Sequence, residues 1–295
     1  MESAVSTELH NTLAKLQTLT GVDDVAQLAD LSGANGGSAL TALAADTRSQ
    51  LVESLVQVVE SDAGTPQQRL AAGVALGLLG DPRLQRPSDS GYWACISPDG
   101  AGSSIGRFPV TNAEFLAFVD AGGYDDDALW TEEGRTWRDS AKRRWPDLAA
   151  SPDATPFVVP NQPVVGVTWH EACAYARWVD ARLPDFEERL QAVRGPEKRP
   201  YPWGSPFGEG NANTQEEVVQ RPVAVGLYLR DRTPQGICDL AGNVAEWCAD
   251  GTDGERWVHP GAWDQPSLSA WAKARVLEAP ESWSPALGFR LAKDK

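Results

Sequence analysis

Residues 236–250, GICDLAGNVAEWCAD, place chemically capable side chains on both sides of a turn. Asp239 and Glu246 are carboxylates seven positions apart, and the Gly242-Asn243 pair between them is typical of a turn. Apolar residues, among them Trp247, fill the remaining positions. The pattern therefore allows three interpretations: a metal-binding loop, the wall of an active site, or a plain turn that buries a tryptophan.

The chain that must position this turn changes character near residue 90. In residues 1–85, apolar residues recur at helical spacing, as in SQLVESLVQVVESD. Thr65 followed by Pro66 is a helix start, and Gly80 is a helix end. We therefore predict a helical N-terminal segment over residues 1–85, suited to docking or linking.

Residues 90–295 form the second predicted domain, which is dense in Trp, Gly and Pro. Helices are expected to begin at Thr111 or Asn112, at Thr168, and at Asp185, where Glu188 completes a capping box. The rest is typical of short strands and long loops, so the predicted fold class is α+β.

Composition limits the function classes. The net charge of −15 repels a phosphate backbone, so nucleic-acid binding is not expected. No apolar run is long enough to insert into a membrane, and the N-terminus lacks the features of a secretory signal. Four scattered cysteines and three histidines favour a reducing, cytoplasmic setting over a disulfide framework or a multi-histidine metal centre.

Five ordered sequence blocks resemble the formylglycine-generating enzyme / sulfatase-modifying factor family. The resemblance implies a C-type-lectin-like fold, a small sheet that carries long, irregular loops. The blocks are RFPVTNAEFLAFVDAGGY (107–124), PVVGVTWHEACAYARWVDARLP (163–184), YPWG (201–204), GICDLAGNVAEW (236–247) and LGFRLA (287–292).

The residues that would make such a domain catalytic are missing. Active members of the resembled family bind copper with two cysteines in the last segment, and residues 261–291 contain no cysteine. Ergothioneine sulfoxide synthases, which use a similar domain, take three histidine ligands for iron from a helical domain, and residues 1–85 contain only His10. We therefore expect no copper and assign no catalytic residue.

The same resemblance implies a calcium site in the opening turn. Carried over by position, Asp239 and Glu246 would supply side-chain oxygens, and Gly242 and Val244 would supply backbone carbonyls, the hard ligands that Ca²⁺ prefers. The alternative is a plain turn in which Asp239 accepts backbone N–H groups and Trp247 packs in the core. A milder departure from the family is Arg189, which stands where a tryptophan is usual.

The closing segment resembles a family template whose fixed positions alternate with other residues. Leu268, Gly288 and Phe289 match the template and are predicted to be framework. Tryptophan among small polar residues suits a binding surface. The predicted ligand-facing set is Trp257, His259, Trp263, Asp264, Gln265, Ser267, Ser269, Trp271, Lys273, Glu281 and Trp283.

These observations favour a non-catalytic protein that binds a protein or another macromolecule. Lectin-like domains of this kind include the variable proteins of diversity-generating retroelements, whose closing segment is mutagenised, and we extend that hypothesis to this chain. Two alternatives stay open: a fixed sensor or scaffold module of a bacterial signalling or defence system, and a copper-dependent oxidase with relocated chemistry.

Overall fold

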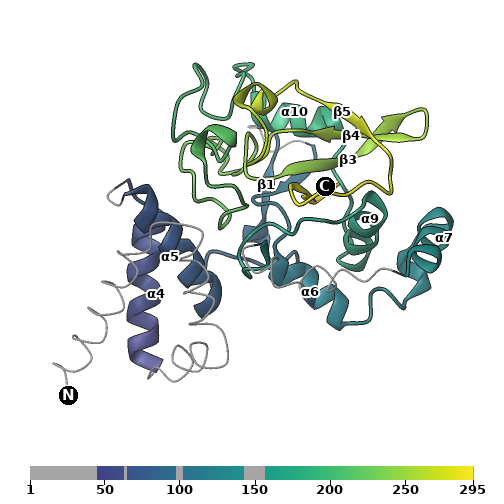
Figure 1. Cartoon of the computed structure of the whole chain (residues 1–295), viewed down its shortest axis with the longest axis horizontal. Helices are drawn as coiled ribbons and strands as arrows, with labels where there is room; N and C mark the ends of the chain where they lie inside the picture. The colour runs from purple at the N-terminus through teal and green to yellow at the C-terminus, as the bar shows by residue number, and fades with distance from the viewer. Residues whose placement is uncertain (1–44, 63–64, 98–101, 143–156, 295) are drawn as a thin grey trace.

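The computed structural model describes residues 45–62, 65–97, 102–142 and 157–294 (Figure 1). The helical structure expected for residues 1–44, including His10, lies outside these ranges. The α-helices are α4 (Ala45–Val59), α5 (Pro66–Leu79), α6 (Asn112–Asp120), α7 (Glu132–Ala141), α9 (Trp169–Trp178) and α10 (Phe186–Arg194). Short 3₁₀ turns are η1 (Ser90–Tyr92), η2 (Asp127–Leu129), η4 (Gln215–Glu217) and η5 (Ser267–Ala270).

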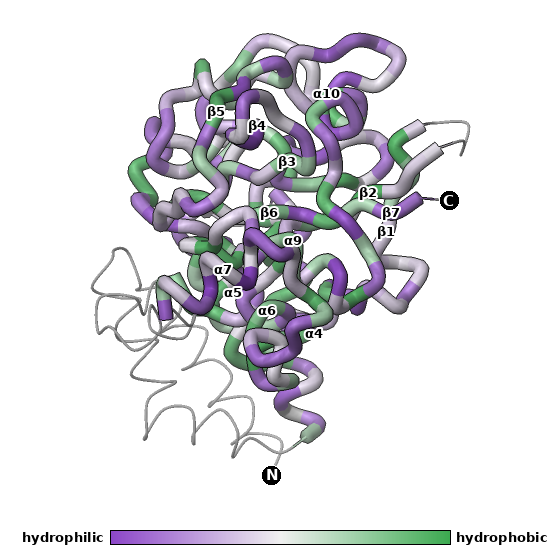
Figure 2. Tube along the Cα trace, turned by 90° about the vertical axis from the view of Figure 1, so that its right-hand side faces the viewer, coloured by the Kyte–Doolittle hydropathy of each residue, from purple (hydrophilic) through white to green (hydrophobic). Residues whose placement is uncertain are grey.

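The strands form two small sheets, which long loops connect. One sheet is antiparallel and has the order β1-β2-β7, with bounds Trp93–Cys95, Ser104–Gly106 and Ala292–Lys293. The other has the order β5-β4-β3-β6, with bounds Val276–Glu278, Glu255–His259, Ala245–Thr252 and Leu287–Phe289. Only the β3–β6 pair of these described strands is parallel. In Figure 2 the four strands follow one another above α9 and α6.

The helix starts agree with the capping residues of the sequence. Thr65, Thr111, Thr168 and Asp185 each cap a helix, and each forms a capping box with the residue three positions on. Helix α7 carries no apolar stripe, and no helix was predicted at its position. Its start is nevertheless marked, because the Thr131 hydroxyl accepts the Gly134 N–H and two glutamates fill the first turn.

Strand β3 separates two hydrophobic cores. Trp247 points into the larger core, where it lies opposite Phe289 of β6. Cys248, the next residue, points into the smaller core against α10. Because side chains alternate along a strand, Glu246 lies on the same side as Cys248. The pleat of β3 therefore aims the glutamate of the opening turn at α10.

The hairpin of α4 and α5 packs on loops of the second predicted domain. Its apolar face shares a core with Val159, Val223 and Leu227. The Asn161 side chain donates to the Gly73 carbonyl oxygen over 2.9 Å and to Asp81 Oδ2 over 2.8 Å. The described part of residues 1–85 therefore packs its apolar face within this chain, and its role in docking or linking stays a prediction.

Gly77→Ala is expected to destabilise the whole described fold, because the added Cβ would lie 2.4 Å from Asn161 Oδ1 and 2.7 Å from Val159 Cγ1. Such overpacking costs roughly 1–3 kcal/mol. All 12 tryptophans follow residue 92, so tryptophan fluorescence reports only on the second domain. We expect the midpoint of denaturant unfolding to fall equally whether it is measured by tryptophan fluorescence or by the helical signal in circular dichroism.

Gly91→Ala is the matched control, since its Cβ would come no nearer than 3.4 Å to the flexible Gln85 side chain. If Gly77→Ala shifted the helical signal alone, the hairpin would be a separate folding unit.

Candidate functional site

The Glu246 carboxylate is the centre of a buried ion-pair cluster. Arg189 of α10 donates through Nε to Glu246 Oε2 over 2.6 Å. Arg290, which follows β6, donates through Nε to both carboxylate oxygens over 2.9 Å and through Nη2 to Oε1 over 2.6 Å. All three side chains are at most 1% exposed. Burial alone would raise the pKa of Glu246, but the two guanidinium groups outweigh that effect and lower it.

The same two arginines also donate hydrogen bonds to the turn that contains Asp239. Arg189 Nη2 donates to the Leu240 carbonyl oxygen over 2.8 Å. Arg290 Nη2 donates to the carbonyl oxygens of Cys238 and Asp239, each over 2.9 Å. The cluster therefore fastens α10, the end of β6 and the turn to one point of β3.

Two further carboxylates shape the turn from inside. Asp231 accepts the backbone N–H groups of Leu240, Ala241 and Gly242 over 3.0–3.1 Å. Asp239 has a φ of 55°, and its Oδ2 accepts the Gly226 N–H over 2.7 Å. Burial raises the pKa of Asp239 to about 7, and the neighbouring Asp231 charge acts in the same direction.

The glycine of the turn has a different role from the one its sequence suggested. Asn243, with a φ of 73°, takes the left-handed conformation, and Gly242 does not. A Cβ on Gly242 would lie 2.6 Å from the Asn213 carbonyl oxygen. Glycine is needed here because another backbone segment passes close to it.

The four predicted calcium ligands lie together but do not fit the ion. Both oxygens of Glu246 are engaged by guanidinium groups, and the Gly242 carbonyl accepts the Val244 N–H over 3.0 Å. A cation brought to Glu246 would meet two positive charges that are already buried there. Trp247 is fully buried, and its Nε1 donates to the Val167 carbonyl oxygen over 3.1 Å. Trp247 therefore packs in the core as the plain-turn alternative has it, whereas the N–H groups of the turn bind Asp231 and Asp239 accepts that of Gly226.

The cysteines do not fit a copper centre either. Burial raises the pKa of Cys173 and of Cys238 to about 12, and it raises that of Cys248 as well, so these groups are thiols at neutral pH. Within the described ranges, no cluster of three or more His, Cys, Asp or Glu side chains could hold a metal ion.

The predicted ligand-facing set divides by exposure. Two of its tryptophans are prominent, since Trp271 is 43% and Trp283 51% exposed. Lys273 and Glu281 are also exposed. The half-buried members are Trp257, Trp263, Asp264, Gln265, Ser267 and Ser269.

Two residues of the closing segment were assigned wrongly. His259 is fully buried and so does not belong to an exposed surface: its Nε2 lies 3.1 Å from the Trp271 carbonyl oxygen, and its Nδ1 accepts the Gly261 N–H. Leu268, predicted to be framework, is 78% exposed on η5. Gly288 and Phe289 are buried, as framework residues should be.

Sequence reasoning noted Arg189 only as a milder departure from the family. The sequence feature that could have revealed the buried ion pair is this arginine itself, because it stands where the resembled family has a tryptophan, on the helix face that packs inward. Such a position demands a buried counter-charge, and Glu246 is the acid of the GNVAEW block.

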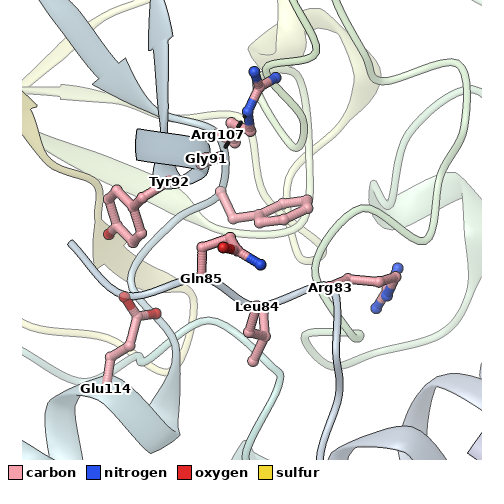
Figure 3. A pocket seen from close by; sticks show the side chains of 8 residues that line it. Arg83, Leu84, Gln85, Gly91, Tyr92, Arg107 and Glu114 are labelled. Carbon is pink, nitrogen blue, oxygen red and sulfur yellow. Dashed lines mark hydrogen bonds between the residues drawn. The ribbon is translucent and has the colours of Figure 1, made fainter. Parts of the chain in front are cut away.

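A small cavity near the start of the second domain is not a ligand site. It has a volume of about 20 Å³ and is lined by residues that include Tyr92, Arg107 and Glu114 (Figure 3). The Tyr92 hydroxyl and the Glu114 carboxylate face each other there, and burial raises the pKa of both groups. The volume suits a single water molecule and nothing larger.

Glu246→Gln is expected to lower the free energy of unfolding by roughly 3–5 kcal/mol, because it leaves two buried guanidinium groups without a counter-charge. Asp294→Asn is the control: it removes an equally short ion pair, to Arg182, at an exposed site and costs at most about 1 kcal/mol. Denaturant titration measures both.

The melting temperature of the metal-free wild-type protein should not change when Ca²⁺ is added. A calcium-dependent rise that Glu246→Gln abolishes would contradict the ion-pair assignment and favour a metal site.

Two known enzymes are similar to this chain in sequence. The chain is 36% identical over 154 residues to a hercynine oxygenase of Mycolicibacterium thermoresistibile. The matched region covers 48% of this chain and 34% of that enzyme. It is 32% identical over 249 residues to the formylglycine-generating enzyme of Streptomyces coelicolor, and this matched region covers 64% of this chain and 77% of that enzyme.

Among solved structures, Treponema denticola variable protein 1 matches 65% of this chain and 84% of its own, with a TM-score of 0.45 and 19% identity. The model of the sulfatase-modifying factor enzyme 1-like domain matches residues 101–295, two thirds of the sequence. The order of the five sequence blocks and the fold that they build agree with this match. The chain belongs to the family of sulfatase-modifying factor enzyme 1-like domains.

Proposed function

We propose that this chain is a non-catalytic domain that binds a protein ligand through its closing segment, residues 257–283. One observation carries the proposal. Seven large hydrophobic side chains of the described residues are exposed, and four of them lie in this segment: Leu268, Trp271, Val276 and Trp283. Exposed tryptophan and leucine on loops are the kind of residues that protein interfaces bury.

The backbone beneath these side chains is anchored. Ser267 donates its N–H to Glu216 Oε1 over 2.8 Å, and Gln265 accepts the Gln215 N–H over 2.9 Å. Burial would raise the pKa of Glu216, but hydrogen bonds from Ser267 and Thr214 lower it to about 2. A loop that is already ordered loses less entropy on binding than a mobile one.

The side chains available as metal ligands support a non-catalytic role. The closing segment supplies no cysteine, and the cysteines elsewhere are scattered, three of them with raised pKa values. The hercynine oxygenase and the formylglycine-generating enzyme named above are enzymes, but neither the copper ligands nor the iron ligands of the resemblance are carried over here. We place the protein in the cytoplasm on the same cysteine usage. None of the helices that the structure describes has the length and apolarity to span a membrane.

The proposal extends to diversification of the surface. Exposed positions alternate with buried ones, as Trp271 does between Ala270 and Ala272. Sequence change at the exposed positions would alter the ligand and leave the fold intact.

A photo-crosslinking amino acid in place of Trp271 is expected to capture a defined protein in the native host. The control carries the same group at Leu116 of α6, which is also 43% exposed. It should not capture the protein that position 271 captures. Trp271→Ala should weaken that partner's binding while changing the free energy of unfolding by at most about 0.5 kcal/mol.

Phe289→Ala should instead destabilise the protein by roughly 3–5 kcal/mol, because it empties a packed site. Equal destabilisation by Trp271→Ala would make Trp271 a core residue and remove the basis of the proposed surface.

The oxidase alternative predicts a different result. Incubation with copper, a reductant and a peptide that carries a sulfatase-type cysteine is expected to leave the peptide mass unchanged. The Streptomyces coelicolor relative serves as the positive control. Conversion of the cysteine to an aldehyde by this chain would overturn the non-catalytic proposal.

A further inference from the structure

Arg221 is a buried cation for which the described part of the chain supplies no counter-charge. Four arginines of the described residues are at most 8% exposed: Arg138, Arg189, Arg221 and Arg290. Three of them form ion pairs with carboxylates. Burial lowers the pKa of Arg221, and no carboxylate of the described residues acts against this effect. A buried charge without a partner is costly, so Arg221 lowers the stability of the fold that contains it.

The backbone around Arg221 is held in place by uncharged amide side chains. Asn213 Nδ2 donates to the Arg221 carbonyl oxygen over 3.0 Å. Asn243 binds Val223 twice, because its Oδ1 accepts the Val223 N–H over 2.9 Å and its Nδ2 donates to the Val223 carbonyl oxygen over 3.2 Å. These bonds satisfy backbone groups, but an amide cannot neutralise a guanidinium. The position of Arg221 is therefore fixed while its charge is not compensated.

One edge of the Arg221 guanidinium is both accessible and without a partner. Nη1 is closed off from solvent and has no hydrogen-bond partner. Nε and Nη2 also lack partners among the described residues, but they are not closed off, and Arg221 keeps 7% of its surface exposed. Together, Nε and Nη2 form the edge of an arginine that can donate two parallel hydrogen bonds.

Two other arginines of this chain show which chemical group that edge binds. Arg83 holds Asp81 through Nε to Oδ1 over 2.9 Å and through Nη2 to Oδ2 over 2.6 Å. Arg290 uses the same two nitrogens on Glu246. A planar group with one negative charge fits such an edge. A phosphate dianion fits less well, because Arg221 offers one positive charge and the whole chain carries a net charge of −15.

We propose that Arg221 binds a carboxylate group through Nε and Nη2. The carboxylate belongs either to a small carboxylic acid or to an acidic side chain of another protein. This site goes beyond the proposed function, because Arg221 lies outside residues 257–283 and none of the exposed side chains of that segment takes part in it.

Arg221→Met is expected to raise the melting temperature of the full chain by at least about 2 °C, because it removes an unpaired buried charge and keeps the apolar stem. Arg138→Met is the matched control, since Arg138 is similarly buried but pairs with Asp127 and donates to the Tyr124 carbonyl oxygen. Its loss should lower the melting temperature. An equal fall for Arg221→Met would mean that the guanidinium is satisfied within the chain, and it would overturn the proposal.

Sodium acetate, compared with sodium chloride at the same ionic strength, is the first probe of binding. The melting temperature of the wild type should rise saturably with acetate, whereas Arg221→Met should show only the general effect of the salt. Acetamide, the neutral isostere, should have no such effect. Arg221→Lys keeps the charge but lacks the paired donors, so its half-saturating acetate concentration should be at least about fivefold higher. The Nε–H NMR signal of Arg221 in the wild type should shift over the same acetate range, a readout that requires no variant to fold.

Two peptides separate the sources of the carboxylate. Acetyl-Gly-Glu-Gly-amide carries an acidic protein side chain, and acetyl-Gly-Gln-Gly-amide is its neutral control. Half-saturation by the glutamate peptide at a concentration at least about tenfold below that of acetate would assign the site to a protein side chain, and a similar or higher concentration would assign it to a small acid. Trp271→Ala should leave both responses unchanged, which separates this site from the closing-segment surface. An equal acetate response in wild type and Arg221→Met, or an Nε–H signal that does not move, would overturn the proposal.

Discussion

A carboxylate at the centre of a hydrophobic fold must be neutralised, and the structure depends on how Glu246 meets this requirement. An isolated buried charge costs several kcal/mol, whereas a pair with good geometry and full hydrogen bonding recovers that cost. Arg189 and Arg290 supply the positive charge and use their remaining N–H groups on carbonyls of the adjoining turn. One cluster thus fixes the relative positions of β3, β6 and α10.

The cluster also places positive charge where the family resemblance implies a calcium ion. A calcium ion and a guanidinium group both bring positive charge to carboxylate and carbonyl oxygens. Arg189 stands where the resembled family has tryptophan, and it delivers its charge from within the chain. A charge that is attached covalently does not depend on calcium concentration, and it carries no entropy of ion capture.

Local rules predicted the local features well. Thr111, Thr168 and Asp185 cap helices because a cap depends only on residues within one turn. Ordered motifs predicted the fold class. The errors concern long-range packing: His259 is buried because a loop twelve residues later folds over it, and Leu268 is exposed although it matches a template position. Helix α7 was missed because its sequence has no apolar periodicity, and only its capping residue and its acidic first turn mark it.

The burial of His259 shows how a changeable surface can rest on a constant frame. Its Nε2 contacts the backbone carbonyl of Trp271 and not the indole. Ser267 and Gln265 are likewise held through their backbone atoms. Bonds of this kind do not depend on which side chain the anchored residue carries, so position 271 can accept other residues without losing its anchor. A binding surface on this fold is therefore limited by its backbone bonds and not by the identity of its exposed side chains.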